Sequence, residues 1–347
     1  MPHGSPPSRF TAYQPGLAWF ATLGGVWVFV LVTLGAFTTS IGAGMAFPDW
    51  PLSNGSLNPN GWLNNVAMFA EHSHRLSAGV MSAITIVLAV WICRTESRRW
   101  LRVLAIAAIA LIFAQAVIGG LRVLLEKHQI VMLETSVGRL FAMLHACLAQ
   151  IFLCTLAAIA AACSRSWTSP KPKSPTKVSL VTRRLGIICC GFLLVQLGIA
   201  AVMRHSFAGL AIATFPQSTP AGDWLPDAWN FRVAIHFAHR MTAVLITGMV
   251  IWFVASLLLA PGISHRLKIW GVGLVGLLCV QIYLGASVVW TGRNPYLTTA
   301  HVIIGAMTLS GTFLLTWLLH RDEIESASAK YSKANQQQEG IAEYSRA

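Results

Sequence analysis

Residues 66–93 read VAMFAEHSHRLSAGVMSAITIVLAVWIC, a long apolar run with one polar cluster, EHSHR, near its start. A helix needs about 20 apolar residues to cross the hydrocarbon core of a bilayer, and this run is longer than that. Ionisable groups inside such a segment are costly, so they indicate a functional site. The stretch therefore predicts a membrane-spanning helix with a chemically active cluster at residues 71–75.

Similar apolar runs lie on both sides of this segment. They cover residues 17–39, 100–122, 138–162, 184–203, 231–259, 267–290 and 297–319. Hydrophobic residues make up 55% of the chain and charged residues only 11%, compared with about 25% charged in an average soluble protein. We therefore predict an all-α membrane protein with eight transmembrane helices and exclude a soluble globular enzyme.

The charge distribution predicts the orientation of these helices. The formal net charge is +13, which in a soluble domain would indicate a nucleic-acid partner. Here most Lys and Arg residues gather in alternate connections, so the positive-inside rule explains them and no nucleic acid is expected. We predict a multi-pass protein of the cell (inner) membrane with both termini cytoplasmic. The expected segments are a cytoplasmic N-terminus (1–16), a four-helix half (17–162), a cytoplasmic linker (163–183), a second four-helix half (184–320) and a cytoplasmic tail (321–347).

The two halves carry polar residues at matching places. Residues 74–75 and 239–240 are both His-Arg, and they lie 165 positions apart. The matched residues are His74 and His239, Gln115 and Gln281, Gly119 and Gly285, and His145 and His301. Because each half has four helices, both halves would enter the membrane in the same direction. The pattern therefore predicts two parallel-repeat four-helix bundles related by an axis along the membrane normal.

The four matched histidines are expected to lie in one layer of the membrane. Each follows the start of its helix by a few residues, which places it roughly 8–12 Å from the outer end at 1.5 Å rise per residue. Imidazole suits zinc, copper and iron, including haem iron. Zinc usually takes more ligands, whereas two histidines from facing helices can hold one haem, so we expect them as axial ligands. We expect small residues to leave room for the macrocycle: Gly79, Gly119, Gly120, Gly285 and Gly305.

Charged residues surround this layer. Arg75 and Arg240 directly follow ligand histidines and Arg122 ends the third helix, so they are candidates to pair with haem propionates or, alternatively, to anchor the helices at the interface. Glu71 stands three residues before His74, whereas its counterpart in the second half is His236. A carboxyl group in an apolar setting suits proton transfer. Pairing of Glu71 with Arg75 is the structural alternative.

These motifs together resemble the haem A synthase family, of the Cox15/CtaA type, over about residues 17–320. They are FPDWP at 47–51, EHSHRL at 71–76, GGLRV at 119–123, His145, His239-Arg240 and His301. The resemblance implies conversion of haem O to haem A for cytochrome oxidase, by oxidation of the C8 methyl group to a formyl group through hydroxylated intermediates. It also implies that His239 and His301 bind a haem b cofactor, that His74 and His145 flank the substrate haem, and that Glu71 is the catalytic glutamate.

The same resemblance implies partners in the membrane, namely lipid, haem O synthase and cytochrome oxidase assembly factors. Many family members carry a cysteine pair in the first outer loop, but residues 44–53 contain no cysteine here.

The residues by themselves leave two other functions open. A b-type cytochrome that only transfers electrons would account for four histidines but not for Glu71, and a transporter would account for the repeat but not for the histidine layer.

Overall fold

The computed structural model describes residues 13–169 and 178–327, and it contains eight helices long and apolar enough to cross a membrane. These are α1 Pro15–Ser40, α2 Val66–Thr95, α3 Arg99–Leu124, α4 Val137–Cys163, α6 Leu180–His205, α7 Phe231–Leu259, α8 His265–Trp290 and α9 Pro295–Leu319. The predicted eight-helix membrane fold is therefore confirmed, and most observed helices extend a few residues beyond the predicted runs. The predicted N-terminal segment, linker and tail lie partly outside the described residues.

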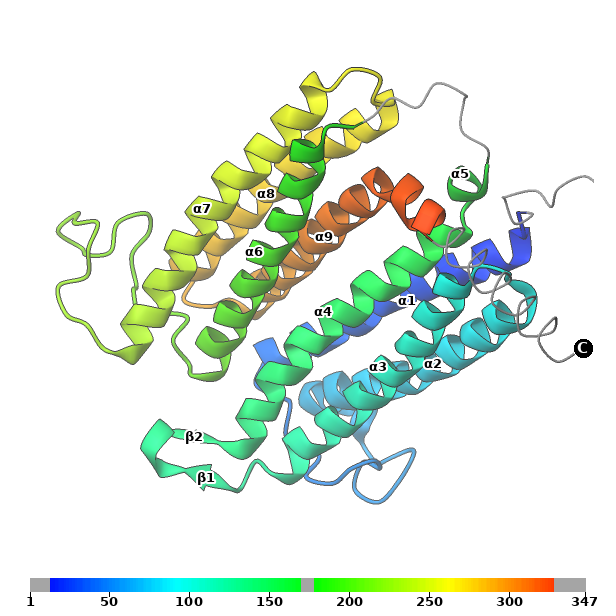
Figure 1. Ribbon diagram of the computed structural model, residues 1–347. Coiled ribbons are helices and arrows are strands. Elements are labelled where there is room, and N and C mark those ends of the chain that lie inside the picture. Colours follow the sequence, from blue (N-terminus) through cyan, green and yellow to red (C-terminus); the bar gives the residue numbers. More distant parts are fainter. Residues whose placement is uncertain (1–12, 170–177, 328–347) are drawn as a thin grey trace, which may run out of the picture.

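The remaining elements are short. They are the 3-10 helices η1 Trp62–Asn64 and η2 Val131–Leu133, the helix α5 Arg165–Thr168, and the antiparallel strands β1 Gln129–Ile130 and β2 Thr135–Ser136. The two strands form a hairpin between α3 and α4, which projects from the end of the bundle where the long loops 41–65 and 206–230 also lie (Figure 1). We refer to this end as the outer end.

The helices that carry the four histidines all begin at the outer end with a capping side chain. An Asn or Ser side chain accepts hydrogen bonds from backbone N–H groups of the first turn, which the helix itself leaves unpaired. The caps are Asn65, Ser136, Asn230 and Asn294. Because each cap fixes where its helix starts, it also fixes the depth of the histidine that follows.

Each half of the chain packs its four long helices around one another. In the first half α1 contacts α2 and α4, and α3 contacts α2 and α4; α6–α9 repeat this pattern, with α6 against α7 and α9 and α8 against α7 and α9. The halves meet where α9 packs on α1 and α4, and where α4 packs on α6 (Figure 1). The two halves therefore share one order of helix contacts, and their relation as parallel repeats stays a prediction.

Two arginines bind the long outer loops to the helices. The Arg75 guanidinium donates to the carbonyls of Asp49 at 2.8 Å and Leu52 at 2.6 Å. Arg240 likewise donates to the carbonyls of Thr214 at 2.6 Å and Ile212 at 3.1 Å. Both side chains therefore hold the loops at the outer end of each half by hydrogen bonds to loop carbonyls. The sequence interpretation did not include this role.

The first outer loop contains a turn held by one carboxylate, which makes its stability pH-dependent. Asp49 accepts hydrogen bonds from the backbone N–H groups of Asn54 at 2.8 Å and Gly55 at 2.7 Å. Partial burial raises the pKa of the Asp49 carboxyl, but the N–H groups of Gly55 and Asn54 outweigh this effect, and the net pKa lies below the ordinary value of 3.8. The turn is therefore stabilised above pH 3.8, and this stabilisation is lost as the pH falls below it.

Limited proteolysis of the loop at different pH values tests this expectation. Cleavage within residues 41–65 should accelerate as the pH falls below the ordinary carboxyl pKa. The Asp49→Asn variant should be cleaved faster at neutral pH, without a further acceleration as the pH falls. A wild-type loop that stays equally protected throughout would contradict the assignment.

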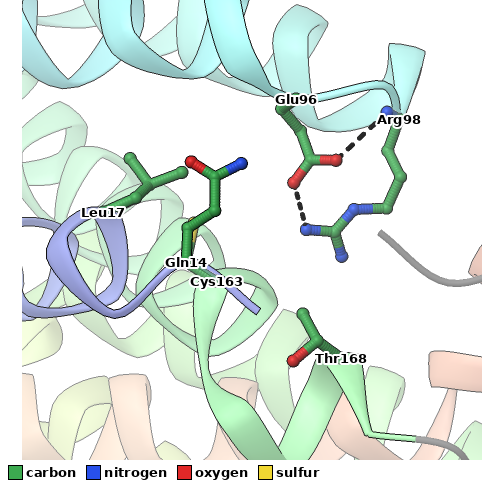
Figure 2. Close-up of a pocket in the computed structure, with 6 residues that line it drawn as sticks. All are labelled: Gln14, Leu17, Glu96, Arg98, Cys163 and Thr168. Carbon is green, nitrogen blue, oxygen red and sulfur yellow. Dashed lines mark hydrogen bonds and ion pairs between the residues drawn. The ribbon is translucent and has the colours of Figure 1, made fainter. Parts of the chain in front are cut away.

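The opposite end of the bundle is closed by a polar and aromatic cluster. Arg98 pairs with Glu96 at 2.5 Å and with Glu325 at 3.4 Å, and the Trp167 indole N–H donates to Glu325 at 2.7 Å. Because Glu325 follows α9, these contacts join the two halves. Figure 2 shows a small pocket here, with the Glu96–Arg98 pair at its edge. It lies at the opposite helix ends from the matched histidines, so it is not the candidate site.

Candidate functional site: two facing histidine pairs

The structure brings the four histidines together as two pairs. The ring centroids of His74 on α2 and His145 on α4 lie 6.5 Å apart, with an angle of 80° between the ring planes. Those of His239 on α7 and His301 on α9 also lie 6.5 Å apart, at an angle of 65°. Since imidazole nitrogens bind transition metals at about 2.0–2.1 Å, two rings that share one metal have centroids about 6–7 Å apart. Both ring separations therefore match that of two imidazoles sharing one metal atom.

The number of ligands distinguishes between the metals that imidazole suits. Among the residues that the structure describes, no group of three or more His, Cys, Asp or Glu side chains could hold a metal ion. A tetrahedral zinc site needs about four ligands, whereas a haem iron needs only axial ligands from the protein. The pairs therefore fit a haem better than zinc.

Glycines pack against three of the four imidazole rings. A Cβ atom added at Gly35 would lie 2.8 Å from Cε1 of His74, one at Gly119 would lie 3.1 Å from Cε1 of His145, and one at Gly285 would lie 3.0 Å from Cε1 of His301. The interpretation that Gly119 and Gly285 make room for a macrocycle is thus corrected: they make room for the histidine rings. Their missing side chains let Cε1 of each ring come close to the backbone of a neighbouring helix.

Substitution of these glycines should weaken haem binding without unfolding the protein. In Gly35→Ala, the methyl group should push the His74 ring from its rotamer at a cost of about 0.5–1.5 kcal/mol. This corresponds to up to about a tenfold loss of affinity at the first pair. Titration of the purified protein with haem, followed by its absorption spectrum, measures the effect.

The matched control is Gly191→Ala on α6, because a Cβ atom at Gly191 meets nothing within 4 Å. Alanine is the better helix former, so the control should bind haem normally and be slightly more stable. Equal haem affinity in Gly35→Ala and Gly191→Ala would show that the ring contact is unimportant.

Glu71 and His236 occupy equivalent places in the two halves. Glu71 is 4% exposed; one oxygen accepts from the backbone N–H of Phe47 at 3.1 Å and the other pairs with Arg75 at 2.5 Å. His236 is also 4% exposed, with Nδ1 3.2 Å from the backbone N–H of Ile212 and Nε2 3.3 Å from Nε of Arg240. The same position therefore carries a carboxylate in one half and an imidazole in the other.

The surroundings of Glu71 differ from the expected apolar setting. Arg75 follows it by one helical turn, and the loop at residue 47 folds back over it, so both carboxylate oxygens have polar partners. Pairing with Arg75, the structural alternative, is thus observed. Arg122 is also engaged, because its guanidinium donates to the carbonyl of Gly44 in the same loop.

Two further polar residues near the pairs were missed by the sequence interpretation. Gln196 on α6 lies against His239, with its amide nitrogen 3.1 Å from Nδ1 of the ring. Arg204, at the outer end of α6, donates to the Ala36 carbonyl at 3.0 Å and to Oγ of Ser40 at 2.8 Å, and so links the halves. An alignment of the two halves could have found Gln196. It lies 165 residues after Leu31, and the same offset relates His239 to His74, so the two halves differ at this position.

The fold and the site define a class: multi-pass membrane proteins that hold two facing histidine pairs inside their helix bundle. The family model of the COX15-CtaA cytochrome oxidase assembly proteins matches residues 18–314. The chain belongs to this family.

Curated relatives agree with this assignment. A heme A synthase of Halalkalibacterium halodurans is 25% identical over 88% of this chain and 97% of its own length. A heme A synthase of Geobacillus kaustophilus is 26% identical over 92% of this chain and 98% of its own length. One from Listeria welshimeri is 28% identical over 85% of this chain and 92% of its own length. The similarity therefore extends across both halves.

Proposed function

We propose that this protein is a haem A synthase, a membrane oxidoreductase that converts the C8 methyl group of haem O to the formyl group of haem A. Family membership and the curated relatives support this function. The observation that carries it is the asymmetry between two otherwise equal sites. Both histidine pairs have the same ring separation, but only the first has a buried carboxylate, Glu71, one helical turn from a ligand.

The two sites take different haems. In the first half (17–162), His74 and His145 flank the substrate haem O. In the second half (184–320), His239 and His301 would hold a resident haem b. When bound, the haem iron supplies the redox chemistry, and the protein supplies orientation and proton transfer.

Glu71, beside the histidine pair that flanks the substrate, takes part in proton transfer. The Glu71 carboxylate is held by Arg75 and by the N–H of Phe47, so it is oriented before substrate arrives. It serves as the proton acceptor during oxidation of the methyl group. Arg75 positions Glu71, and the outer loop lies against both residues through the N–H of Phe47 and the carbonyls of Asp49 and Leu52.

The cationic side chains have divided roles in this proposal. Arg75 and Arg240 bind the loop carbonyls, which leaves fewer of their donors for the propionates of the haems. Arg122 lies close enough to Glu71 and Arg75 to interact with their charges. We assign Arg122 to the propionates of the substrate haem.

The orientation of the protein follows from its charges. Eight membrane-spanning helices make it a multi-pass membrane protein. We place it in the cell (inner) membrane with both termini cytoplasmic, so that the histidine layer lies near the outer leaflet. Haem O is lipophilic, and a haem O synthase and cytochrome oxidase assembly factors are the expected neighbours that deliver substrate and receive product.

The pigment of the purified protein tests the function. Haem A or hydroxylated haem O in the extract is expected from wild-type protein. The equal geometry of the two pairs favours one alternative, a b-type cytochrome that only transfers electrons. Haem b alone, in both wild type and Glu71→Gln, would establish that alternative, and absence of any haem would favour a transporter.

A further inference from the structure

We propose that Gln196 is a positioning residue that fixes His239 for permanent haem binding, and that its replacement by Leu31 in the first half leaves His74 free to exchange its haem. This inference rests on the proposed function, in which one site keeps its haem and the other takes up substrate and releases product. The sequence difference between these two positions would then decide which half is the cofactor site.

The Gln196 side chain contacts both the ring and the backbone of His239. Its amide nitrogen lies 3.1 Å from Nδ1 and 2.9 Å from the carbonyl oxygen of His239. Its Oε1 atom is buried and has no hydrogen-bond partner among the described residues. The two ends of an amide have nearly the same shape, so the group can also turn Oε1 toward the ring. In that orientation Nδ1 would donate its proton to Oε1 and leave Nε2 for iron, and the amide would give up its hydrogen bond to the His239 carbonyl.

The first half has no side chain of this kind. Leu31 on α1 occupies the equivalent position, and its backbone carbonyl is the acceptor that faces the His74 ring. Even so, His74 Nδ1 is buried without a hydrogen bond of ordinary geometry to residues 13–169 or 178–327. A leucine side chain cannot donate or accept a hydrogen bond. The side chain at position 31 therefore cannot hold the His74 ring as Gln196 holds the His239 ring.

The second ligand of each pair shows the same difference. Nδ1 of His301 lies 3.1 Å from the carbonyl oxygen of Gln281, a hydrogen-bond distance. His145 faces the carbonyl of the matching Gln115, but its Nδ1 lacks hydrogen-bond geometry toward any described residue. In the second pair both Nδ1 atoms thus lie at hydrogen-bond distance from a partner, whereas in the first pair both rings face a backbone carbonyl without that geometry.

Such partners change both affinity and electronic character. A histidine that donates its second N–H is held in orientation and becomes a more basic ligand, and loss of the partner typically costs about 10–100-fold in metal affinity. Stronger donation to the iron also lowers the reduction potential of a haem. The second site is therefore built to retain its haem, and the first site to release it.

The experiment exchanges the two residues in the full-length protein in detergent, reconstituted with haem b. In Gln196→Leu, transfer of haem b to an excess of apomyoglobin should be about 10–100-fold faster, and the midpoint potential of the remaining haem should rise. Gln196→Glu, a stronger acceptor of nearly the same shape, should retain the haem and lower the potential. In Leu31→Gln, haem release from the first site should become slower.

A matched control separates this role from general packing. Gln150→Leu makes the same change in the membrane helix α4, and it should leave haem b transfer and potential unchanged. Equal release from Gln196→Leu and wild type, or equal loss in Gln196→Leu and Gln150→Leu, would overturn the inference. If Gln196→Leu does not fold, an unchanged potential in Gln196→Glu would overturn it as well.

The same measurements keep this inference apart from the proposed function. Wild-type protein without any spectrum of haem held by two histidines would contradict the proposed function itself. Wild-type protein with that spectrum, but with no response to substitution at residue 196, would contradict only the role of Gln196.

Discussion

In the Glu71→Gln variant, haem A formation should be lost while both haem sites still fill. The amide keeps the size of the carboxyl group, and its oxygen can still accept the hydrogen bond from Phe47, but it cannot take up a proton. General acid–base groups typically contribute 10²–10⁴-fold to a rate, so turnover should fall by about that factor. Pigment analysis of membranes supplied with haem O, by chromatography of the extracted haems, measures the product.

Retention of haem is expected because the surroundings of Glu71 do not depend on its charge alone. Arg75 also donates to loop carbonyls, including those of Asp49 and Leu52, so the outer loop should stay in place when the ion pair is removed. The proposed haem ligands His74 and His145 are unchanged. An intact spectrum with no product would thus separate catalysis from binding.

The control for this variant is Glu126→Gln. Glu126 lies in the connection between α3 and α4, pairs with Arg139 at 3.3 Å and accepts from Oγ of Ser136, so it is another paired outer glutamate. This variant should form haem A at the wild-type rate. A normal yield of haem A from Glu71→Gln would remove Glu71 from the mechanism.

The sequence predicts the helices and the pairs well, for a physical reason. A membrane helix must be long and apolar, so the ends of an apolar run predict the ends of the helix. For the run 231–259, the observed helix has the same bounds. Matched spacing then places His74 with His239 and His145 with His301 at one depth. That depth and the packing of alternate helices are sufficient to bring the rings into pairs.

The contacts around the pairs could not be predicted in this way. Arg75 was a candidate for the propionates because arginine binds anions, but its hydrogen bonds to the carbonyls of loop 41–65 depend on the path of that loop. Likewise, Gly119 lies against the His145 ring because of how α3 faces α4, which no spacing within one helix reveals. Loop paths and helix rotation depend on tertiary packing, and a single sequence does not record them directly.

Removal of either histidine of the second pair should abolish the low-spin haem b spectrum. In His239→Ala or His301→Ala, one face of the iron has no protein ligand, because no third metal-binding side chain is grouped with the pair in the described part of the chain. Two strong axial ligands produce the low-spin state, so one ligand should not maintain it. Absorption spectroscopy of the reduced protein, with haem quantified after extraction, measures the loss.

Three comparisons make this result specific. His128→Ala changes an exposed histidine at the outer end and should leave the spectrum intact. His74→Ala should leave the haem b of the second half in place, because the two pairs lie in separate groups of four helices. In His301→Gly, added imidazole should restore the spectrum by filling the space beside Gly285 that the ring occupied. A low-spin spectrum that survives both His239→Ala and His301→Ala would refute the assignment, because neither residue would then be an axial ligand of that haem.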